Sequence, residues 1–329
     1  DGIPLADGEF LLEARRERLL GPPPQLQLLR MPKRRVLSAS LDSSLRLWDV
    51  DSAKVTRVLK GHGDAVVSLG VDWGSQCALS GAHDCTLRLW DLDHGVCVDS
   101  ISTPGHPAFC IALNFGSRRA LTGSWDKTIK VWNLDRSMCM NTLQGHEELV
   151  SCLAVNWIAG RALSGSYDET LRLWRLDSGA CIQCMTGHEG RISAVNVDWG
   201  SNRALSGAWD ATIRLWDLAT GELTATLEGH GDVVGCLAVS WESMRALSGS
   251  WDRSLRLWDL ESKTCIRNVE VGATSVTCLS ADWGAGSFYA GSSDSVITVW
   301  GISELEKLGT LQGHKDMVSC LIGTCSGTP

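Results

Sequence analysis

Residues 229–259 read GHGDVVGCLAVSWESMRALSGSWDRSLRLWD, and variants of this stretch follow one another along most of the chain. A tryptophan and an aspartate of the stretch each recur every 42 residues, without insertion or deletion. The tryptophans are Trp48, Trp90, Trp132, Trp174, Trp216, Trp258 and Trp300, and the aspartates are Asp42, Asp84, Asp126, Asp168, Asp210, Asp252 and Asp294. A regular period of this length predicts a series of like structural units.

One unit shows what each repeat forms. Residues 65–73 are mostly β-branched or apolar and are bounded by Gly63-Asp64 and Gly74-Ser75, which predicts a buried strand. Further strands are predicted at 77–81, 86–90 and 96–101, with a tight turn at 82–84 and a loop at 91–95. Four short strands in 42 residues are the size of one propeller blade.

The first strand of each unit carries small residues, as it would where blades converge on an axis. One position runs Ser68, Cys110, Cys152, Ala194, Cys236, Cys278 and Cys320. The position two residues on runs Gly70, Ala112, Ala154, Asn196, Ala238 and Ser280. Because a lone four-stranded sheet cannot bury both faces, we expect an all-β, seven-bladed β-propeller with four antiparallel strands per blade.

The two ends of the repeat region complement each other. A Gly-Pro-Pro-Pro run at 21–24 stands where the first unit should have Gly-His, whereas Gly313-His314 precedes a strand-like segment, 317–321, with nothing after it. We predict that this C-terminal strand completes the first blade, pairing with 36–40 and 45–48. Residues 25–31 are a weaker competitor, because flanking prolines remove hydrogen-bond donors from a ladder.

The propeller is expected over residues 36–329, preceded by an N-terminal extension over 1–35. Residues 9–20 mix leucines and charges and are followed by Gly21 and prolines, which predicts a short helix and a proline-rich linker. The first ten residues do not resemble a signal peptide. The chain begins with Asp1 rather than Met, so the sequence allows an upstream segment, including a removed targeting segment.

Composition narrows the class of protein. Hydrophobic residues make up 44% and charged residues 21%, which is typical of a soluble globular protein, and no apolar run is long enough to insert into a membrane. The net charge is −8, and the N-terminal 35 residues are net basic, so the repeats are more acidic still. Nucleic acid is therefore an unlikely partner. Most of the cysteines recur at repeat-equivalent positions too far apart for disulfides, so we expect a reducing, cytoplasmic location.

From about residue 36 to 321 the chain resembles the WD-repeat family. The matching motifs are Gly229-His230, the segment Leu247-Ser248-Gly249-Ser250-Trp251-Asp252, and Leu255-Arg256-Leu257-Trp258-Asp259. The resemblance implies a structural hydrogen-bonded tetrad of His, Ser, Asp and Trp in a blade. The five expected sets are His62, Ser80, Asp84, Trp90; His146, Ser164, Asp168, Trp174; His188, Ser206, Asp210, Trp216; His230, Ser248, Asp252, Trp258; and His314, Ser38, Asp42, Trp48.

Two blades depart from this pattern, and we expect them to be softer than the others or held by a partner. Pro104 replaces the histidine in the unit of Asp126 and Trp132, and Gly272 and Ala290 replace both His and Ser in the unit of Asp294 and Trp300. A Ser, His and Asp in one unit could suggest a hydrolase triad, but five copies indicate folding rather than catalysis. We therefore expect no catalytic residue and no cofactor. We also expect no metal site, because the lone Cys181-x-x-Cys184 lacks a second ligand pair.

The residue before each turn aspartate is the candidate for binding. In the resembled family this position rims the central channel on the face of the Gly-His loops. The series reads Leu41, His83, Trp125, Tyr167, Trp209, Trp251 and Ser293, and acidic residues of neighbouring loops include Asp64, Glu148, Glu189 and Asp232. Aromatic faces near carboxylates favour a cation, such as an Arg or Lys side chain of a partner protein. The alternative interpretation is that these rings only pack over adjacent loops.

The sequence thus predicts a non-catalytic protein-protein interaction scaffold, or a structural subunit of a multiprotein assembly. The alternative is a peptide-reading substrate receptor, for example of a ubiquitin ligase, that binds a cationic segment at the aromatic rim. No recruiting domain such as an F-box is visible in residues 1–35.

Overall fold

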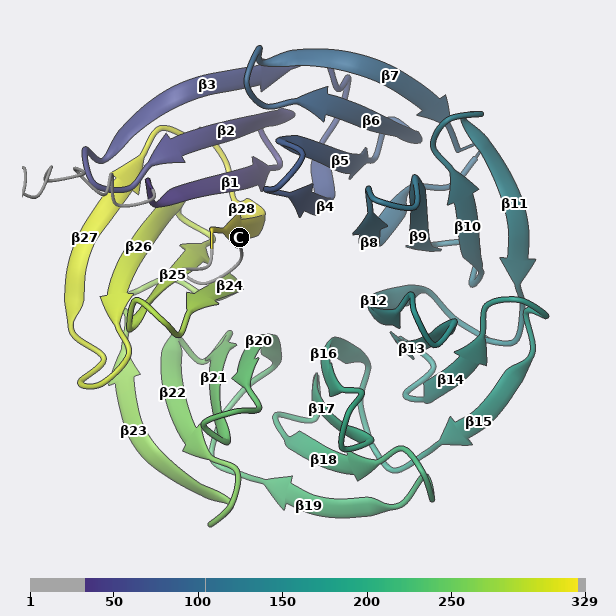
Figure 1. The fold of residues 1–329 in the computed structure, drawn as a ribbon. Helices are drawn as coiled ribbons and strands as arrows, with labels where there is room; N and C mark the ends of the chain where they lie inside the picture. Colours follow the sequence, from purple (N-terminus) through teal and green to yellow (C-terminus); the bar gives the residue numbers. More distant parts are fainter. Residues whose placement is uncertain (1–32, 104, 325–329) are drawn as a thin grey trace, which may run out of the picture. The chain divides into compact units, whose positions relative to one another are not determined.

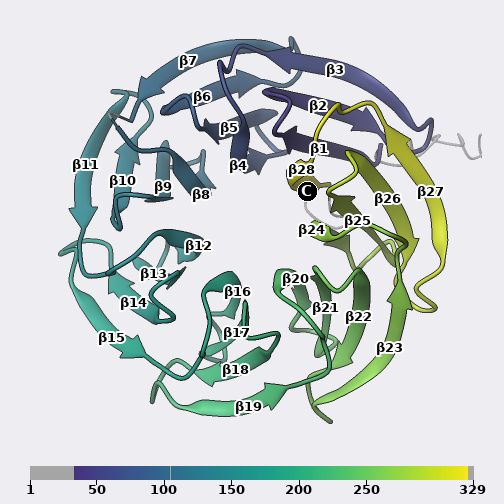
Figure 2. The same ribbon diagram turned by 180° about the vertical axis from the view of Figure 1, so that it is seen from behind.

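The computed structural model describes residues 33–103 and 105–324. Over these residues, 28 strands form seven four-stranded antiparallel sheets. Figure 1 and Figure 2 show the sheets as blades arranged in a ring, with one strand of each blade nearest the centre, here called the channel, and one at the rim. The predicted seven-bladed, all-β propeller is confirmed. The expected helix at 9–20, the proline-rich linker and the competing strand at 25–31 lie outside the described residues.

The blades are numbered here along the chain, and the strands of each are given from the channel outward. Blade 1 contains β28 (Val318–Gly323), β1 (Arg35–Ser40), β2 (Ser44–Asp49) and β3 (Lys54–Lys60). Blade 2 contains β4 (Val66–Asp72), β5 (Cys77–Ala82), β6 (Thr86–Asp91) and β7 (Val96–Ser102). Blade 3 contains β8 (Ala108–Asn114), β9 (Arg119–Ser124), β10 (Ile129–Asn133) and β11 (Met138–Leu143).

The remaining blades follow the same order. Blade 4 contains β12 (Val150–Asn156), β13 (Arg161–Ser166), β14 (Leu171–Arg175) and β15 (Cys181–Met185). Blade 5 contains β16 (Ile192–Asp198), β17 (Arg203–Ala208), β18 (Ile213–Asp217) and β19 (Leu223–Leu227). Blade 6 contains β20 (Val234–Ser240), β21 (Arg245–Ser250), β22 (Ser254–Asp259) and β23 (Thr264–Glu270). Blade 7 contains β24 (Val276–Asp282), β25 (Ser287–Ser292), β26 (Val296–Gly301) and β27 (Lys307–Gln312).

The turn aspartate shapes the hairpin between the second and third strands of a blade. Asp84 Oδ1 accepts hydrogen bonds from the Thr86 backbone N–H (3.0 Å) and from its hydroxyl (2.7 Å). Cys85 between them adopts a left-handed φ of 57°, and Arg253 does the same with φ 68°. An Asx turn of this kind closes the hairpin without glycine, which explains why aspartate keeps the repeat spacing.

The core lies between blades rather than within them. Trp258 of blade 6 is 1% exposed and packs with Leu205 and Leu215 of blade 5. Trp48 of blade 1 packs likewise with Tyr289 and Val299 of blade 7. Each blade therefore buries its tryptophan against its neighbour, and the apolar surface is removed from water only when the ring is complete.

The ring closes as predicted, through the C-terminal strand. β28 pairs antiparallel with β1, with Leu321 opposite Ser38 and Ile322 opposite Leu37. β1 pairs on its other edge with β2, so blade 1 combines strands from the two ends of the propeller. Figure 1 shows β28 beside β1 at the channel.

The innermost strand of every blade contains a β-bulge near its start. In blade 2 the pairing steps from Val66 opposite Ala82 to Ser68 opposite Gly81, which leaves Val67 without a partner residue. The inner strands of all the other blades have the same shift. The unpaired residues recur every 42 positions, from Phe109 in blade 3 to Ser319 in β28 of blade 1. A bulge interrupts the alternation of side chains between the two faces of a sheet and so changes the direction in which the side chain of the extra residue points.

Candidate functional site

The structure brings together all five predicted tetrads. In blade 2, His62 is hydrogen-bonded through Nδ1 to Asp84 Oδ2 (2.9 Å) and through Nε2 to Ser80 Oγ (2.7 Å), and Trp90 Nε1 donates to the same Oγ (2.8 Å). The tetrads of His146, His188, His230 and His314 have the same bonds, with His–Asp distances of 2.7 to 2.9 Å. In each, the serine oxygen joins the histidine to the indole N–H.

The electrostatics of the tetrads follow from burial and hydrogen bonding. Burial alone would raise the pKa of Asp42, but hydrogen bonds from Ser44, the Lys315 backbone N–H and His314 outweigh it and hold the pKa at about 2. Burial lowers the pKa of His314 despite the opposing effect of the hydrogen bond that it donates to Asp42. The Ser80 hydroxyl is fully buried between its two partners, so the tetrads stabilise blades and offer no accessible nucleophile.

The two departing blades satisfy their tryptophans differently. In blade 3, Trp132 Nε1 donates to Thr122 Oγ1 (2.9 Å), and the Lys130 ammonium donates to Asp126. Pro104 lies outside the described residues. In blade 7, Trp300 Nε1 donates to Thr298 Oγ1 (2.7 Å) on its own strand, since position 290 is alanine. Whether these blades are softer stays a prediction.

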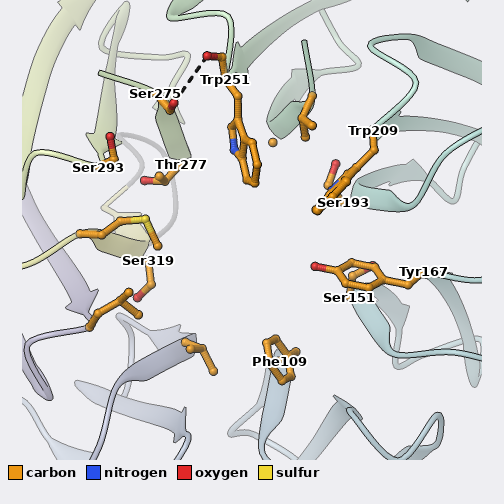
Figure 3. Close-up of a pocket in the computed structure, with 15 residues that line it drawn as sticks. Phe109, Ser151, Tyr167, Ser193, Trp209, Trp251, Ser275, Thr277, Ser293 and Ser319 are labelled. Atoms are coloured by element: carbon orange, nitrogen blue, oxygen red, sulfur yellow. Dashed lines mark hydrogen bonds between the residues drawn. The ribbon is translucent and has the colours of Figure 1, made fainter. Parts of the chain in front are cut away.

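A cavity of about 610 Å³ occupies the channel on the side of the turn aspartates. All seven bulge residues line it, namely Val67, Phe109, Ser151, Ser193, Gly235, Thr277 and Ser319. Figure 3 shows Phe109, Tyr167, Trp209 and Trp251 around one part of the opening, with the small side chains of Ser293, Thr277 and Ser319 on the other. The cavity is therefore lined by aromatic side chains on one side and by non-aromatic side chains on the other.

The bulge-residue hydroxyls of the channel wall form hydrogen bonds within the ring. Ser151 Oγ donates to the Ile192 carbonyl (2.5 Å), Thr277 Oγ1 to the Val318 carbonyl (2.5 Å), and Ser319 Oγ to the Val66 carbonyl (2.6 Å). Each bond links one blade to the next. None of the residues lining the cavity is charged, so the cavity suits an apolar or aromatic group better than an ion.

The predicted rim series is only partly at this cavity. Leu41, Tyr167, Trp209, Trp251 and Ser293 line it, as predicted from their shared position. His83 and Trp125 are not among its lining residues and instead pack on either side of Phe109, each with ring centroids 5.6 Å from it.

The bulge residue Phe109 lines the cavity, whereas His83 and Trp125, which contact its ring, do not. Sequence reasoning missed the bulge series, although the same 42-residue spacing marks it. The signal was present, but strand alternation assigns these residues to the wrong face.

The predicted carboxylates lie outside the cavity, in exposed loops. Asp64 and Asp232 each accept a hydrogen bond from the next backbone N–H (2.7 Å). Glu148 lies 3.5 Å from the Lys127 ammonium, and Glu189 is exposed. These acids do not form part of the lining that contains the aromatic rings.

Arg191 was also missed, and it changes the chemistry of the rim. Its guanidinium carbon lies 4.8 Å from the ring centroids of both Tyr167 and Trp209. The chain thus supplies its own cation to these two rings. In the described ranges, no carboxylate oxygen is within 4.0 Å of this guanidinium.

Three tryptophans remain substantially exposed around the opening. Trp125 is 57% exposed, Trp251 42% and Trp209 36%. Trp209 and Trp251 lie in contact, with ring centroids 5.4 Å apart, and Gly235 lies beside the Trp251 indole. We call Phe109, Trp125, Tyr167, Trp209 and Trp251 the aromatic mouth.

Within residues 33–103 and 105–324, no group of three or more His, Cys, Asp or Glu residues is arranged to hold a metal ion. No helix in the same ranges is long and apolar enough to cross a membrane.

Comparison with known proteins identifies the repeat. The family model described as "WD domain, G-beta repeat" matches residues 53–91, 95–133, 137–175, 179–217 and 221–259, together more than half of the chain. No curated protein matches the chain. The matched segments run from the outer strand of one blade to the third strand of the next, which agrees with the 42-residue period and the propeller. The chain belongs to the WD40 family.

Proposed function

We propose that this chain is a non-catalytic scaffold that holds a partner protein at the aromatic mouth, as a subunit of a larger assembly. WD40 propellers generally act as protein-interaction scaffolds and are typically non-enzymatic. The observation that carries the proposal is the exposure of Trp125, Trp209 and Trp251 beside a cavity of about 610 Å³. Exposed tryptophans around a pocket are typical of the centre of a protein interface.

The proposed contact is an apolar or aromatic side chain entering the cavity. The cavity lining carries no charge, and Arg191 already lies against Tyr167 and Trp209. Insertion of an apolar group would bury the exposed faces of Trp209 and Trp251, and burial of apolar area is the main source of binding free energy at such interfaces.

A second candidate is a peptide-reading substrate receptor that takes a cationic segment. The exposed acidic loop residues Asp64, Glu148, Glu189 and Asp232 favour it, because they provide negative charge next to the aromatic mouth. In this case an Arg or Lys of the partner would pair with the loops while a neighbouring side chain occupies the cavity.

Quantitative affinity purification of the full chain tests the proposal. The double variant Trp209→Ala/Trp251→Ala should lose the wild-type partners while its circular dichroism and melting temperature stay close to wild type. Ile158→Ala is the matched control, because Ile158 is fully exposed in the loop between β12 and β13, at the other end of the blade from the turn aspartates. Retention of the same partners by the double variant would contradict the proposal.

The same purification separates the two candidates. Glu148→Gln/Glu189→Gln should leave an apolar contact intact but weaken capture of a cationic segment, with a dependence on salt that wild type shows and the variant lacks.

We also propose a cytoplasmic location. Every cysteine in the described ranges is unpaired, which suits a reducing compartment. Fluorescence microscopy of the tagged full-length protein tests this.

A further inference from the structure

Blade 7 has lost three side chains that fill the same space in its sister blades. Gly272 stands where five blades have the tetrad histidine, and Ala290 stands where six have Ser or Thr. Thr298 replaces the long cation found in every other blade, at Arg46, Arg88, Lys130, Arg172, Arg214 and Arg256. In blade 2 the corresponding arginine, Arg88, reaches over the Gly-His loop, with Nη1 2.9 Å from a Cβ built at Gly61.

A cavity of about 210 Å³ remains in the vacated space. Ala290, Thr298 and Asp294 line it, together with Thr274, Lys307 and Gln312. A Cβ built at Gly272 would meet no atom within 4 Å, so the place of the missing histidine is open. A water molecule takes about 30 Å³ in the liquid, and the cavity therefore has room for a five-membered ring.

The Oδ1 atom of Asp294 accepts hydrogen bonds as in the other blades, whereas its Oδ2 atom accepts none from the described residues. Its Oδ1 accepts hydrogen bonds from the Ser292 hydroxyl (2.5 Å) and from the Val296 backbone N–H (3.2 Å). In the tetrad blades the second oxygen, Oδ2, accepts from the histidine and from the following backbone N–H, as in His230 and Gly231 to Asp252. No donor in the described part of the chain bonds to Asp294 Oδ2, and Asp294 is exposed where its tetrad counterparts are not.

Blade 3 shows that an aspartate without the tetrad histidine can still find a second donor. Its aspartate, Asp126, accepts a hydrogen bond from the Lys130 ammonium, which comes from the position that is Thr298 in blade 7. Thr298 is too short for this, and it already accepts from Trp300 and donates to the Ala290 carbonyl (3.3 Å). Blade 7 alone combines an unfilled cavity with a carboxylate oxygen open to a donor, within the described residues.

We propose that blade 7 binds an imidazole ring, the side chain of a histidine supplied by a partner protein, in the place of its own missing histidine. The five sister tetrads show the required geometry, with an imidazole nitrogen 2.7 to 2.9 Å from the aspartate oxygen. The ring would donate to Asp294 Oδ2 and lie against Ala290.

The charged residues of the cavity and the positions of the chain's histidines indicate which ligand the cavity binds. Lys307 is the other charged residue of the lining, and it repels an added cation, so a neutral imidazole suits the cavity better than a guanidinium. All eight histidines of the chain lie between His62 and His314, five of them in tetrads and His83, His94 and His106 in blades 2 and 3. Residues 1–32 and 325–329 contain none, so these segments do not supply the ring, and we assign it to a partner protein.

The test is a titration of the ¹⁵N-labelled full chain with 4-methylimidazole, with methylguanidinium as the comparison ligand, followed by amide chemical shifts. We expect saturable shifts of the Thr274, Ala290 and Thr298 amides with 4-methylimidazole and weaker binding of methylguanidinium. The absence of saturable shifts in blade 7, or tighter binding of methylguanidinium, would overturn the proposal.

Two variants locate the site. Val271→Gly/Gly272→His/Ala290→Ser restores the sister sequence, including the glycine before the histidine, and should abolish the shifts by filling the cavity. Asp294→Asn keeps an oxygen for the Val296 N–H and should weaken 4-methylimidazole binding about tenfold, as expected for loss of a charge-assisted hydrogen bond. If the restored variant does not fold, Asp294→Asn still decides, because unchanged affinity there contradicts the proposal.

Discussion

At the scale of single residues, the tetrad serine is the side chain that joins the most buried polar groups within a blade. Ser206 Oγ accepts from Trp216 Nε1 (2.8 Å) and is bonded to His188 Nε2 (2.7 Å), and the residue is fully buried. Its removal leaves a buried indole N–H and a buried imidazole nitrogen without partners. Each such group costs about 1–3 kcal/mol.

Ser206→Ala should therefore lower the free energy of unfolding by about 2–4 kcal/mol, from two unsatisfied groups that relax in part. Urea denaturation followed by tryptophan fluorescence measures this. Ser201→Ala is the control, since the hydroxyl of the exposed Ser201 bonds only to the half-buried Asp198 side chain (2.5 Å). A loss no larger than that of the control would show that the tetrad does not stabilise the blade.

The tetrads also predict the pH dependence of stability. Burial lowers the pKa of His62, His230 and His314 in the folded state. In the unfolded chain the histidine pKa is about 6.5. As the pH falls through this value, the histidines of the unfolded chain bind protons while these folded rings stay neutral. The pKa values of Asp84, Asp168, Asp210 and Asp252 are lowered, because hydrogen bonds outweigh the effect of burial. In both cases the unfolded state binds more protons, so acid destabilises the fold.

The urea midpoint should therefore fall as the pH is lowered through about 6.5, where the histidines contribute, and fall further below about 4, where the aspartates do. Denaturation curves at a series of pH values measure this. A midpoint that is constant or rises between pH of about 7 and 5 would contradict the pKa directions given for the histidines.

The same residues show what the sequence could predict. All five tetrads were predicted from the resemblance to the WD-repeat family, and the constant 42-residue spacing allowed each member to be assigned in every unit. The site was predicted in part: Tyr167, Trp209 and Trp251 lie at the cavity, whereas Phe109 and Arg191 were missed. Phe109 was missed because strand alternation assigns a bulge residue to the wrong face of the sheet, and Arg191 because its position depends on a contact between loops of neighbouring blades.

At the scale of elements, closure depends on one strand from the far end of the propeller. β28 supplies the innermost strand of blade 1, and its Leu321 is 3% exposed in a cluster with Trp48 and Tyr289. The prediction of this pairing succeeded because residues 317–321 had strand character and no partner within their own repeat. Strand bounds in blade 2 were predicted to within one residue, whereas the bulges within the inner strands were not.

Leu321→Asp should destabilise the protein by more than about 3 kcal/mol, because it buries an unpaired carboxylate in the seam between blades 7 and 1. Leu308→Asp on β27 is the matched control, since Leu308 is 57% exposed, and it should stay within about 0.5 kcal/mol of wild type. Thermal and urea unfolding of both variants test this, and equal effects would contradict closure by β28.

At the scale of the whole molecule, seven like units surround a channel whose mouth is not symmetric. Blades 3 to 6 provide the aromatic mouth, while blades 7 and 1 provide Ser293, Thr277 and Ser319 (Figure 3). Identical repeats would give a uniform ring. The difference lies in a few positions that neither the tetrads nor the blade cores use, which leaves them available for binding.

The most direct test of the central claim is oxidative footprinting of the chain alone and in complex with its purified partner, with mass spectrometry of the modified residues. The account predicts that oxidation of Trp209 and Trp251 falls several-fold in the complex, while Ile158 is oxidised equally in both samples. Protection of Ile158 with no change at the two tryptophans would show that the partner does not bind at the aromatic mouth.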